Sequence, residues 1–429
     1  MQNNTEKAWL SNLNRATENI LMPLTMIAFL LYSTIINNWT HGFMETSQNI
    51  FILAIFAVTG LNIIFNKGWA RENISVWIVI YAVVRLVSVV ATGFEYAAIR
   101  SVMLEMFFLI GISDLTVGNV KKLKIYFAVF IFIITAFDIF SIYVGIRAPG
   151  NASFTYHVAE KTSFFFHPYA GMYLNRNGAA IMSGLAIVAM LCFLKDIKNK
   201  YAKAGIYALV LFHLAYMLLQ GCRSAEIALL AAGLAFLFKK TFKNVSGKTV
   251  IMLALAGCLA INGAAYVFME LNYNTNPKDL NTAEQKVNSL STGRYAIWKG
   301  CIIEQKEHFL FGAGALSSEQ DGRKELLTKE NGYSEDFYSR TKFGPHSGYI
   351  ASVSVTGWLG TIAFLLVLIN KIRKSEMLNR EKWYIFVVFL LAVNLFEALF
   401  IINRFILGYF VFMIMEMKPE DEENDLPEC

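Results

Sequence analysis

The chain has 429 residues, of which 56% are hydrophobic and only 16% are charged. A soluble domain keeps roughly a quarter of its residues charged, so this composition excludes an ordinary soluble protein and favours a membrane protein. The net charge of +6 is spread in small basic clusters between apolar runs, which is typical of membrane-topology charges and argues against nucleic-acid binding. The five cysteines form no CxxC or Cys/His pattern, so they indicate no zinc site.

Apolar runs long enough to cross a bilayer recur along the whole chain, since a hydrocarbon core needs roughly 20 apolar residues per helix. The N-terminus shows no cleavable signal pattern. We therefore predict an all-α polytopic membrane protein of about twelve transmembrane helices, forming a single integral membrane domain over residues 1–429. The expected helices lie near 18–37, 48–66, 73–93, 97–114, 123–146, 177–195, 203–220, 224–239, 248–269, 346–370, 383–401 and 403–417.

Basic residues alternate between the connections of these helices. Lys67 and Arg71 follow the second helix, for example, whereas the short connections 38–47 and 94–96 hold no Lys or Arg. Because basic loops face the cytoplasm, we expect both termini inside a bacterial inner membrane. The segment 270–345, between the ninth and tenth helices, is then a large extracytoplasmic loop, and 418–429 is an acidic cytoplasmic tail.

Several arginines lie at the expected outer ends of helices, against that charge rule. Arg147, Arg176, Arg223 and Arg404 belong to this group. Arginine binds phosphate through a planar fork of donors with a permanent charge, so a ring of arginines at one membrane face suits a lipid-linked phosphate. The alternative is that each side chain reaches anionic headgroups or pairs with a neighbour.

Four ionisable residues fall within apolar spans, where charge is costly and usually has a protein partner. Arg85 and Glu105 lie on consecutive expected helices and can pair, and we interpret the set, with Asp138, as mostly structural. Glu397 and Arg404 flank the outer turn of the last hairpin, so we expect that they can reach the same cavity.

Three segments stand out as candidates for function. Arg223 opens a helix, whose free N–H groups and positive dipole end favour an anion. From Arg294 the sequence predicts an amphipathic helix on the membrane surface with Trp298 at headgroup level, or a helix that only packs the loop down. Gly312-Ala313-Gly314 often marks a plain turn, and His346, which opens the next helix after a proline, is on its own more often a structural histidine.

Taken in order, these motifs resemble the O-antigen ligase and O-antigen polymerase superfamily (the Wzy/WaaL type). The resemblance is densest over about 175–365. Two features depart from the family pattern: Ser347 replaces the usual Asn, and the stretch between Gly314 and His346 is long and charged. The residues that carry the resemblance are Asn175-Arg176-Asn177-Gly178, Arg223-Ser224, Gly293-Arg294…Trp298, Gly312-x-Gly314, His346-Ser347 and Gly357-x-x-Gly360.

The resemblance implies a membrane glycosyltransferase of the C type, with a polyprenyl-diphosphate-linked glycan as donor and a glycan or lipid-core hydroxyl as acceptor, at the outer face. Such a donor carries its own leaving group, so no nucleotide-binding loop and no cofactor are expected. The sequence shows no clear acidic metal site, so we expect transfer without a metal. Arg223 and Arg294 are then expected to stabilise the leaving diphosphate, and His346 to accept the acceptor proton or only to orient a substrate. The expected substrate-binding residues are Arg176, Asn177, Trp298, Gly312, Gly314, Ser347 and Arg404.

Two further functions stay open. A polymerase of surface polysaccharide repeat units (O-antigen or capsule), working with a chain-length regulator, is favoured over a ligase that moves finished glycan to a lipid A core. A lipid-glycan flippase or transporter is the alternative from another class, and the intramembrane charges Arg85, Glu105 and Asp138 keep it open. A transporter does not need so long an outer loop, and it places substrate charges nearer the middle of the membrane.

Overall fold

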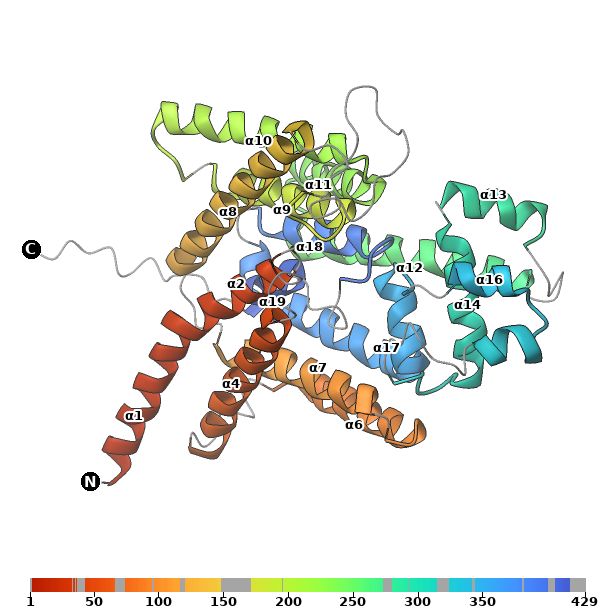
Figure 1. The fold of residues 1–429 in the computed structure, drawn as a ribbon. Coiled ribbons are helices and arrows are strands. Elements are labelled where there is room, and N and C mark those ends of the chain that lie inside the picture. Colours follow the sequence, from red (N-terminus) through yellow and green to blue (C-terminus); the bar gives the residue numbers. More distant parts are fainter. Residues whose placement is uncertain are drawn as a thin grey trace, which may run out of the picture.

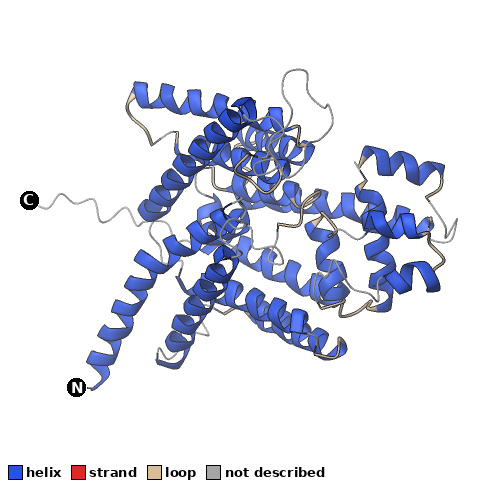
Figure 2. Cartoon of the chain, in the orientation of Figure 1, coloured by secondary structure: helices blue, strands red, loops and turns tan. Residues whose placement is uncertain are grey.

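The structure is a computed structural model that describes most of the chain. The described residues are 2–32, 34, 36, 43–65, 74–94, 96–115, 120–147, 171–194, 196–272, 280–291, 293–314, 324–341, 344–379, 382–399 and 406–416. Within them the chain forms helices and turns, and Thr34 and Tyr173 make one isolated β-bridge. Figure 2 shows the helical character of the molecule.

Many of the described helices begin at a polar side chain that accepts a backbone N–H. Such caps are Ser75 before α6, Asn175 before α9 and Ser246 before α12. The helices are α1 (Gln2–Ala16), η1 (Thr17–Leu21), α2 (Met22–Tyr32), α4 (Phe43–Phe65), α6 (Val76–Ala91), α7 (Tyr96–Leu115), α8 (Val120–Arg147), α9 (Arg176–Phe193), α10 (Lys200–Gln220), α11 (Arg223–Thr241), α12 (Gly247–Leu271), α17 (Gly348–Lys374), η3 (Met377–Asn379), α18 (Tyr384–Val393) and α19 (Ile406–Glu416).

The predicted all-α polytopic membrane architecture is confirmed. A helix stands at each of the twelve predicted positions, within the residues described. Six of the described helices are long and apolar enough to cross a membrane by length and composition: Thr46–Phe65, Leu123–Val144, Arg176–Phe193, Lys200–Gln220, Gly247–Leu271 and Gly348–Lys374. Others, such as α6 and α18, are apolar but shorter.

Helices α9 and α18 form the centre of the molecule (Figure 1). All residues of α18 are buried, as are those of α9 from Ala179 to Met190, and α18 packs against α9, α11 and α12. A Cβ at Gly184 of α9 would lie 2.8 Å from the ring of Phe389 in α18. A small residue at this contact lets the two helices approach closely, which is a common device of membrane helices.

The described residues between α12 and α17 are largely helical. They include α13 (Thr282–Leu290), α14 (Arg294–Glu307), η2 (Leu326–Glu330) and α16 (Glu335–Thr341), and the labelled helices among them lie together at the right of Figure 1. The predicted helix at Arg294 is confirmed, but every residue from Tyr295 to Gln305 is buried. The structure therefore differs from the expected surface helix: Trp298 packs inside the protein, in a core with Leu327 and Phe337.

A buried ion pair holds α13 against α14. Lys299 Nζ lies 2.5 Å from Glu284 Oε1, and both side chains are almost fully buried. The Tyr295 hydroxyl donates to the same carboxylate at 2.9 Å. Burial first, and then the Glu284 charge, raise the pKa of Tyr295 well above its ordinary value. The tyrosine therefore stays protonated and remains a donor to Glu284.

Candidate functional site

The side chain of Glu397, in the turn after α18, joins three elements that are far apart in sequence. Its Oε1 accepts hydrogen bonds from Arg294 Nη2 at 2.5 Å and from Asn177 Nδ2 at 2.8 Å. Its Oε2 lies 3.4 Å from His346 Nδ1. Three residues predicted from the sequence therefore meet at one carboxylate, which is only 9% exposed. We call Asn177, Arg294, His346 and Glu397 the Glu397 cluster.

Backbone and side-chain bonds around Asn394 position this carboxylate. Glu397 N donates to Val393 O at 2.9 Å, and Leu399 N donates to Asn394 Oδ1 at 2.9 Å. The Asn394 carbonyl in turn accepts from Gly348 N, in the first turn of α17, at 2.9 Å. The turn that carries Glu397 is therefore tied directly to the helix start that follows His346.

His346 has an uncommon backbone conformation. Its φ is +46°, and Phe94 is the other non-glycine residue with a positive φ in the described part of the chain. Such a conformation costs on the order of 1 kcal/mol or more and persists only where neighbouring contacts impose it. Here Trp298 Nε1 donates to the Pro345 carbonyl at 2.6 Å, and the Ser347 side chain caps α17. These contacts hold the imidazole beside Glu397 while 43% of the side chain stays exposed.

In the described contacts, Trp298 and Ser347 position the backbone on either side of His346. Trp298 fixes the residue before the histidine, and Ser347 Oγ lies 3.4 Å from the Asn262 and Asn394 oxygens. Both were expected to bind substrate, and that role stays a prediction. The observed contacts assign them the positioning of His346.

Arg294 stands at the first position of α14, after Gly293, which has a φ of +84°. Its side chain is 16% exposed and forms an ion pair with Glu397, and its guanidinium lies 5.9 Å from the ring centre of Phe396. An arginine carries five N–H donors in a fixed fork. The guanidinium can therefore keep Glu397 as a partner and still present donors to an anion.

Arg223 opens α11 and is exposed. The chain arrives there through Gly221, which ends α10 with a φ of +60°, and Cys222, which precedes the helix. Burial raises the pKa of the Cys222 thiol, while the Glu397 and Arg294 charges act on it in opposite directions. Arg223 thus stands at a helix start, where free backbone N–H groups and the helix dipole favour an anion.

Arg176 begins α9 directly beside Asn177, and Asn175 caps this helix by accepting from Gly178 N at 2.7 Å. Arg176 is half-buried. Arg176, Arg223 and Arg294 thus each stand at the first position of a helix. Arg404 lies outside the described residues.

Gly312 and Gly314 belong to a segment that packs against a break in α17. Among the described contacts, neither glycine hydrogen-bonds to the Glu397 cluster. Gly357, with a φ of +64°, interrupts α17. The segment 309–314 satisfies the backbone groups that the break sets free: Gly314 N donates to Val355 O at 3.0 Å, and Trp358 N donates to Phe309 O at 3.1 Å. Substrate binding by these glycines stays a prediction, because their contacts account for a structural role.

The predicted pair of Arg85 and Glu105 is present, with Arg85 Nε 2.8 Å from Glu105 Oε2 and both side chains buried. Arg85 also donates to the carbonyls of Gly314 and Val355 at 3.0 and 3.3 Å. The pair therefore anchors α6 and α7 to the break in α17.

Asp138, the other expected structural charge, is fully buried and accepts from several donors. Tyr173 OH lies 2.6 Å away, Ser183 Oγ 2.7 Å away, and His213 Nδ1 2.9 Å away. The described acidic, histidine and cysteine residues form no group of three or more suited to hold a metal ion.

Sequence reasoning gave Glu397 no site role of its own. The available signals were an acidic residue in an apolar run, where a charge needs a partner, and its closeness in sequence to Arg404. Its true partners lie 51, 103 and 220 positions away in sequence, so only the tertiary structure identifies them.

Comparison with known proteins relates part of this chain to a family. Residues 206–365 match the family described as O-antigen ligase, a range that includes Arg223, Arg294 and His346. A Haemophilus influenzae protein described as uncharacterized is 28% identical over 203 residues, which are 46% of this chain and 49% of the relative. The chain thus spans about half the length of this relative.

Proposed function

We propose that this chain is a membrane glycosyltransferase, and the match of residues 206–365 to the family described as O-antigen ligase supports this proposal. In this proposal it moves a glycan from a polyprenyl diphosphate to an acceptor sugar hydroxyl at the outer face of the inner membrane. The observation that carries the proposal is the meeting of Arg294, His346 and Asn177 at Glu397.

The chemistry needs an anion site and a proton acceptor close together. The bond between the anomeric carbon and the diphosphate oxygen breaks, and a bond from that carbon to the acceptor oxygen forms. The diphosphate leaves with the bonding electrons, and Arg294 and Arg223 stabilise the growing negative charge. The acceptor proton passes to His346, since imidazole is the side chain most often used as a general base.

Glu397 has two parts in this scheme. It accepts from His346 Nδ1, which leaves Nε2 as the ring nitrogen that faces the acceptor hydroxyl. It also holds the Arg294 guanidinium by a charge-assisted bond in the absence of substrate. A diphosphate can bind the guanidinium donors that Glu397 leaves free, so Arg294 would link Glu397 to the donor substrate.

The structure also bears on the transporter alternative. Arg85 is paired with Glu105, and Asp138 accepts from His213, Tyr173 and Ser183. These charges, which kept a transporter open, already have partners within the described part of the protein. We therefore favour the enzyme.

Reconstitution tests the proposal directly. Purified protein in liposomes is supplied with lipid-linked repeat units alone, and the products are separated by size. Longer lipid-linked glycan is the expected result for a polymerase. If neither chain extension nor transfer to an added lipid-core acceptor occurs, the proposal is wrong.

We favour a polymerase over a ligase, and a glycan ladder from a deletion strain separates the two. A strain without a polymerase shows single repeat units on its acceptor. A strain without a ligase instead accumulates long lipid-linked polymer. The first pattern is the expected one.

A further inference from the structure

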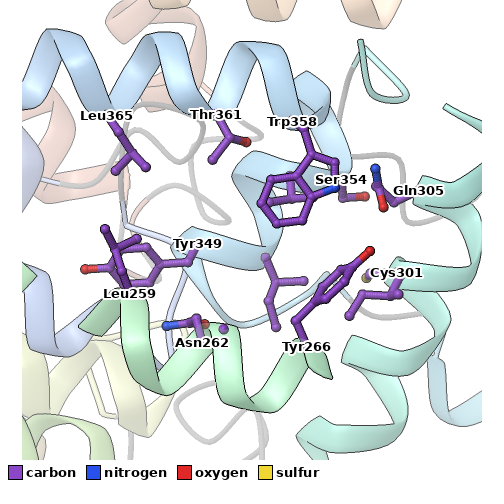
Figure 3. Close-up of a pocket in the computed structure, with 14 residues that line it drawn as sticks. Leu259, Asn262, Tyr266, Cys301, Gln305, Tyr349, Ser354, Trp358, Thr361 and Leu365 are labelled. Carbon is purple, nitrogen blue, oxygen red and sulfur yellow. The ribbon is translucent and has the colours of Figure 1, made fainter. Parts of the chain in front are cut away.

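A cavity with chemistry unlike that of the Glu397 cluster lies between α12, α14 and α17 (Figure 3). Its volume is about 240 Å³, and none of the residues that line it is charged. Sites for whole drug-sized ligands usually measure roughly 300–1,000 Å³, so this cavity suits a smaller group. Without a charged partner it does not suit a diphosphate.

Apolar side chains form most of the wall. Leu259, Ile302, Val353 and Leu365 are among them. The helices α12 and α17 on either side are both candidate membrane spans. A ligand with this chemistry therefore comes from the bilayer and not from water.

Two polar atoms distinguish this cavity from an ordinary packing gap. Gln305, which is 1% exposed, donates its Nε2 to the Phe309 carbonyl at 3.0 Å, but its buried Oε1 has no hydrogen-bond partner. Trp358 Nε1 is also buried and unpartnered; the Tyr266 hydroxyl lies nearby without the geometry of a hydrogen bond. Unpaired buried polar atoms are uncommon and costly.

Gln305 and Trp358 lie together at one end of the cavity, and Leu259 and Leu365 lie toward the other end (Figure 3). The site thus offers one acceptor and one donor beside an apolar space. A hydroxyl group can donate to Gln305 Oε1 and accept from Trp358 Nε1 at the same time. An ether or ester oxygen can only accept, and an ammonium brings a charge that the cavity does not balance.

We propose that this cavity binds an aliphatic chain that carries one hydroxyl group, taken from a membrane lipid. This inference does not rest on the proposed glycosyl transfer. The cavity is also connected to the Glu397 cluster: Asn262, which lines it, lies 3.4 Å from the hydroxyl of Ser347, next to His346. A chain seated here therefore lies directly beside the proposed site.

Photolabelling tests this binding site. The full-length protein is placed in nanodiscs of saturated phosphatidylcholine and exposed to a dodecanol that carries an aliphatic diazirine, or to the same probe without its hydroxyl. Mass spectrometry then locates the labelled peptides. We expect saturable labelling of α12 and α17, with the alcohol binding roughly threefold to tenfold more tightly than the alkane because it makes two hydrogen bonds.

Two glycines of α12 provide a blocking variant and its control. A Cβ at Gly263, in the cavity wall, meets nothing within 4 Å, and the same is true of Gly257, which does not line the cavity. Gly263→Leu should therefore fill the space and abolish labelling without breaking the fold. Gly257→Leu, with the same added side chain on the same helix, should label like the wild type.

The polar end is tested separately. Gln305→Leu and Trp358→Phe should each remove the preference for the alcohol while labelling by the alkane remains. Equal binding of both probes to the wild type, or labelling that Gly263→Leu leaves unchanged, would overturn the proposal.

Discussion

At the scale of single residues, the proposed transfer depends on Arg294, which contacts Glu397, and on Arg223, which opens α11. Arg294→Ala or Arg223→Ala should leave a folded, inserted protein whose transfer rate falls about 10²–10³-fold, the usual effect of removing one charge-stabilising donor. The measurement is glycan extension by the reconstituted variants.

Matched variants make this result specific. Arg294→Lys keeps the charge but loses the planar fork, so it should recover only part of the rate. Arg373→Ala removes an exposed arginine from the last turn of α17 and should behave like the wild type. Polymer of normal length from Arg294→Ala would contradict the assignment.

His346 calls for a different substitution because of its backbone. Asparagine tolerates a positive φ better than alanine does, so His346→Asn keeps the local conformation while it removes the proton acceptor. We expect kcat to fall about 10²–10⁴-fold while KM for the donor changes little. Steady-state kinetics over a range of donor concentrations provide both constants, and an unchanged kcat would exclude His346 as the base.

At the scale of elements, the break in α17 positions the segment 309–314 and the Arg85–Glu105 pair, which both contact it. A Cβ at Gly357 or Gly312 would meet the backbone of the opposite segment, and both glycines have a positive φ. Gly357→Ala and Gly312→Ala should therefore each lower the free energy of unfolding by at least about 2 kcal/mol. Thermal unfolding in detergent measures this effect.

A third glycine serves as the control for these two. Gly233 lies in the middle of α11 with open space around its missing Cβ. Gly233→Ala should stabilise the protein slightly, by about 0.5–1 kcal/mol, because alanine loses less backbone entropy in a helix. Equal effects at Gly233 and Gly357 would show that the break needs no glycine.

At the scale of the whole molecule, the orientation in the membrane stays a prediction that follows from the basic loops. Lys329 and Lys240 are both exposed, the first between α14 and α17 and the second in the last turn of α11. The native cysteines in the described residues are buried. Single exposed cysteines can therefore report on each side once Cys429 is replaced by serine.

An impermeant maleimide on intact spheroplasts should label Lys329→Cys, because the 270–345 segment is expected outside. Lys240→Cys should react only after the membrane is permeabilised, because the basic connection after α11 is expected inside. The reverse pattern would invert the predicted topology and place the Glu397 cluster in the cytoplasm.

The sequence by itself was enough to predict the all-α membrane architecture and to find the resemblance to the family that residues 206–365 match. Long apolar runs have few stable structures in a bilayer other than helices, since each helix satisfies its own backbone hydrogen bonds. Motifs such as Arg223-Ser224 and His346-Ser347 are local and can be read in order along the chain. The pairing of Arg85 with Glu105 was also predictable, because two buried opposite charges on consecutive helices need each other.

Only the tertiary structure decided which of these residues meet, which side chain joins them and which glycines serve the fold. Glu397 contacts residues from three distant segments, and no periodicity or local spacing encodes such contacts. The burial of Trp298, the role of Gly312 at the break in α17 and the uncharged cavity beside Gln305 have the same origin. Each depends on how separate helices pack together, and packing is a property of the whole fold and not of any one segment.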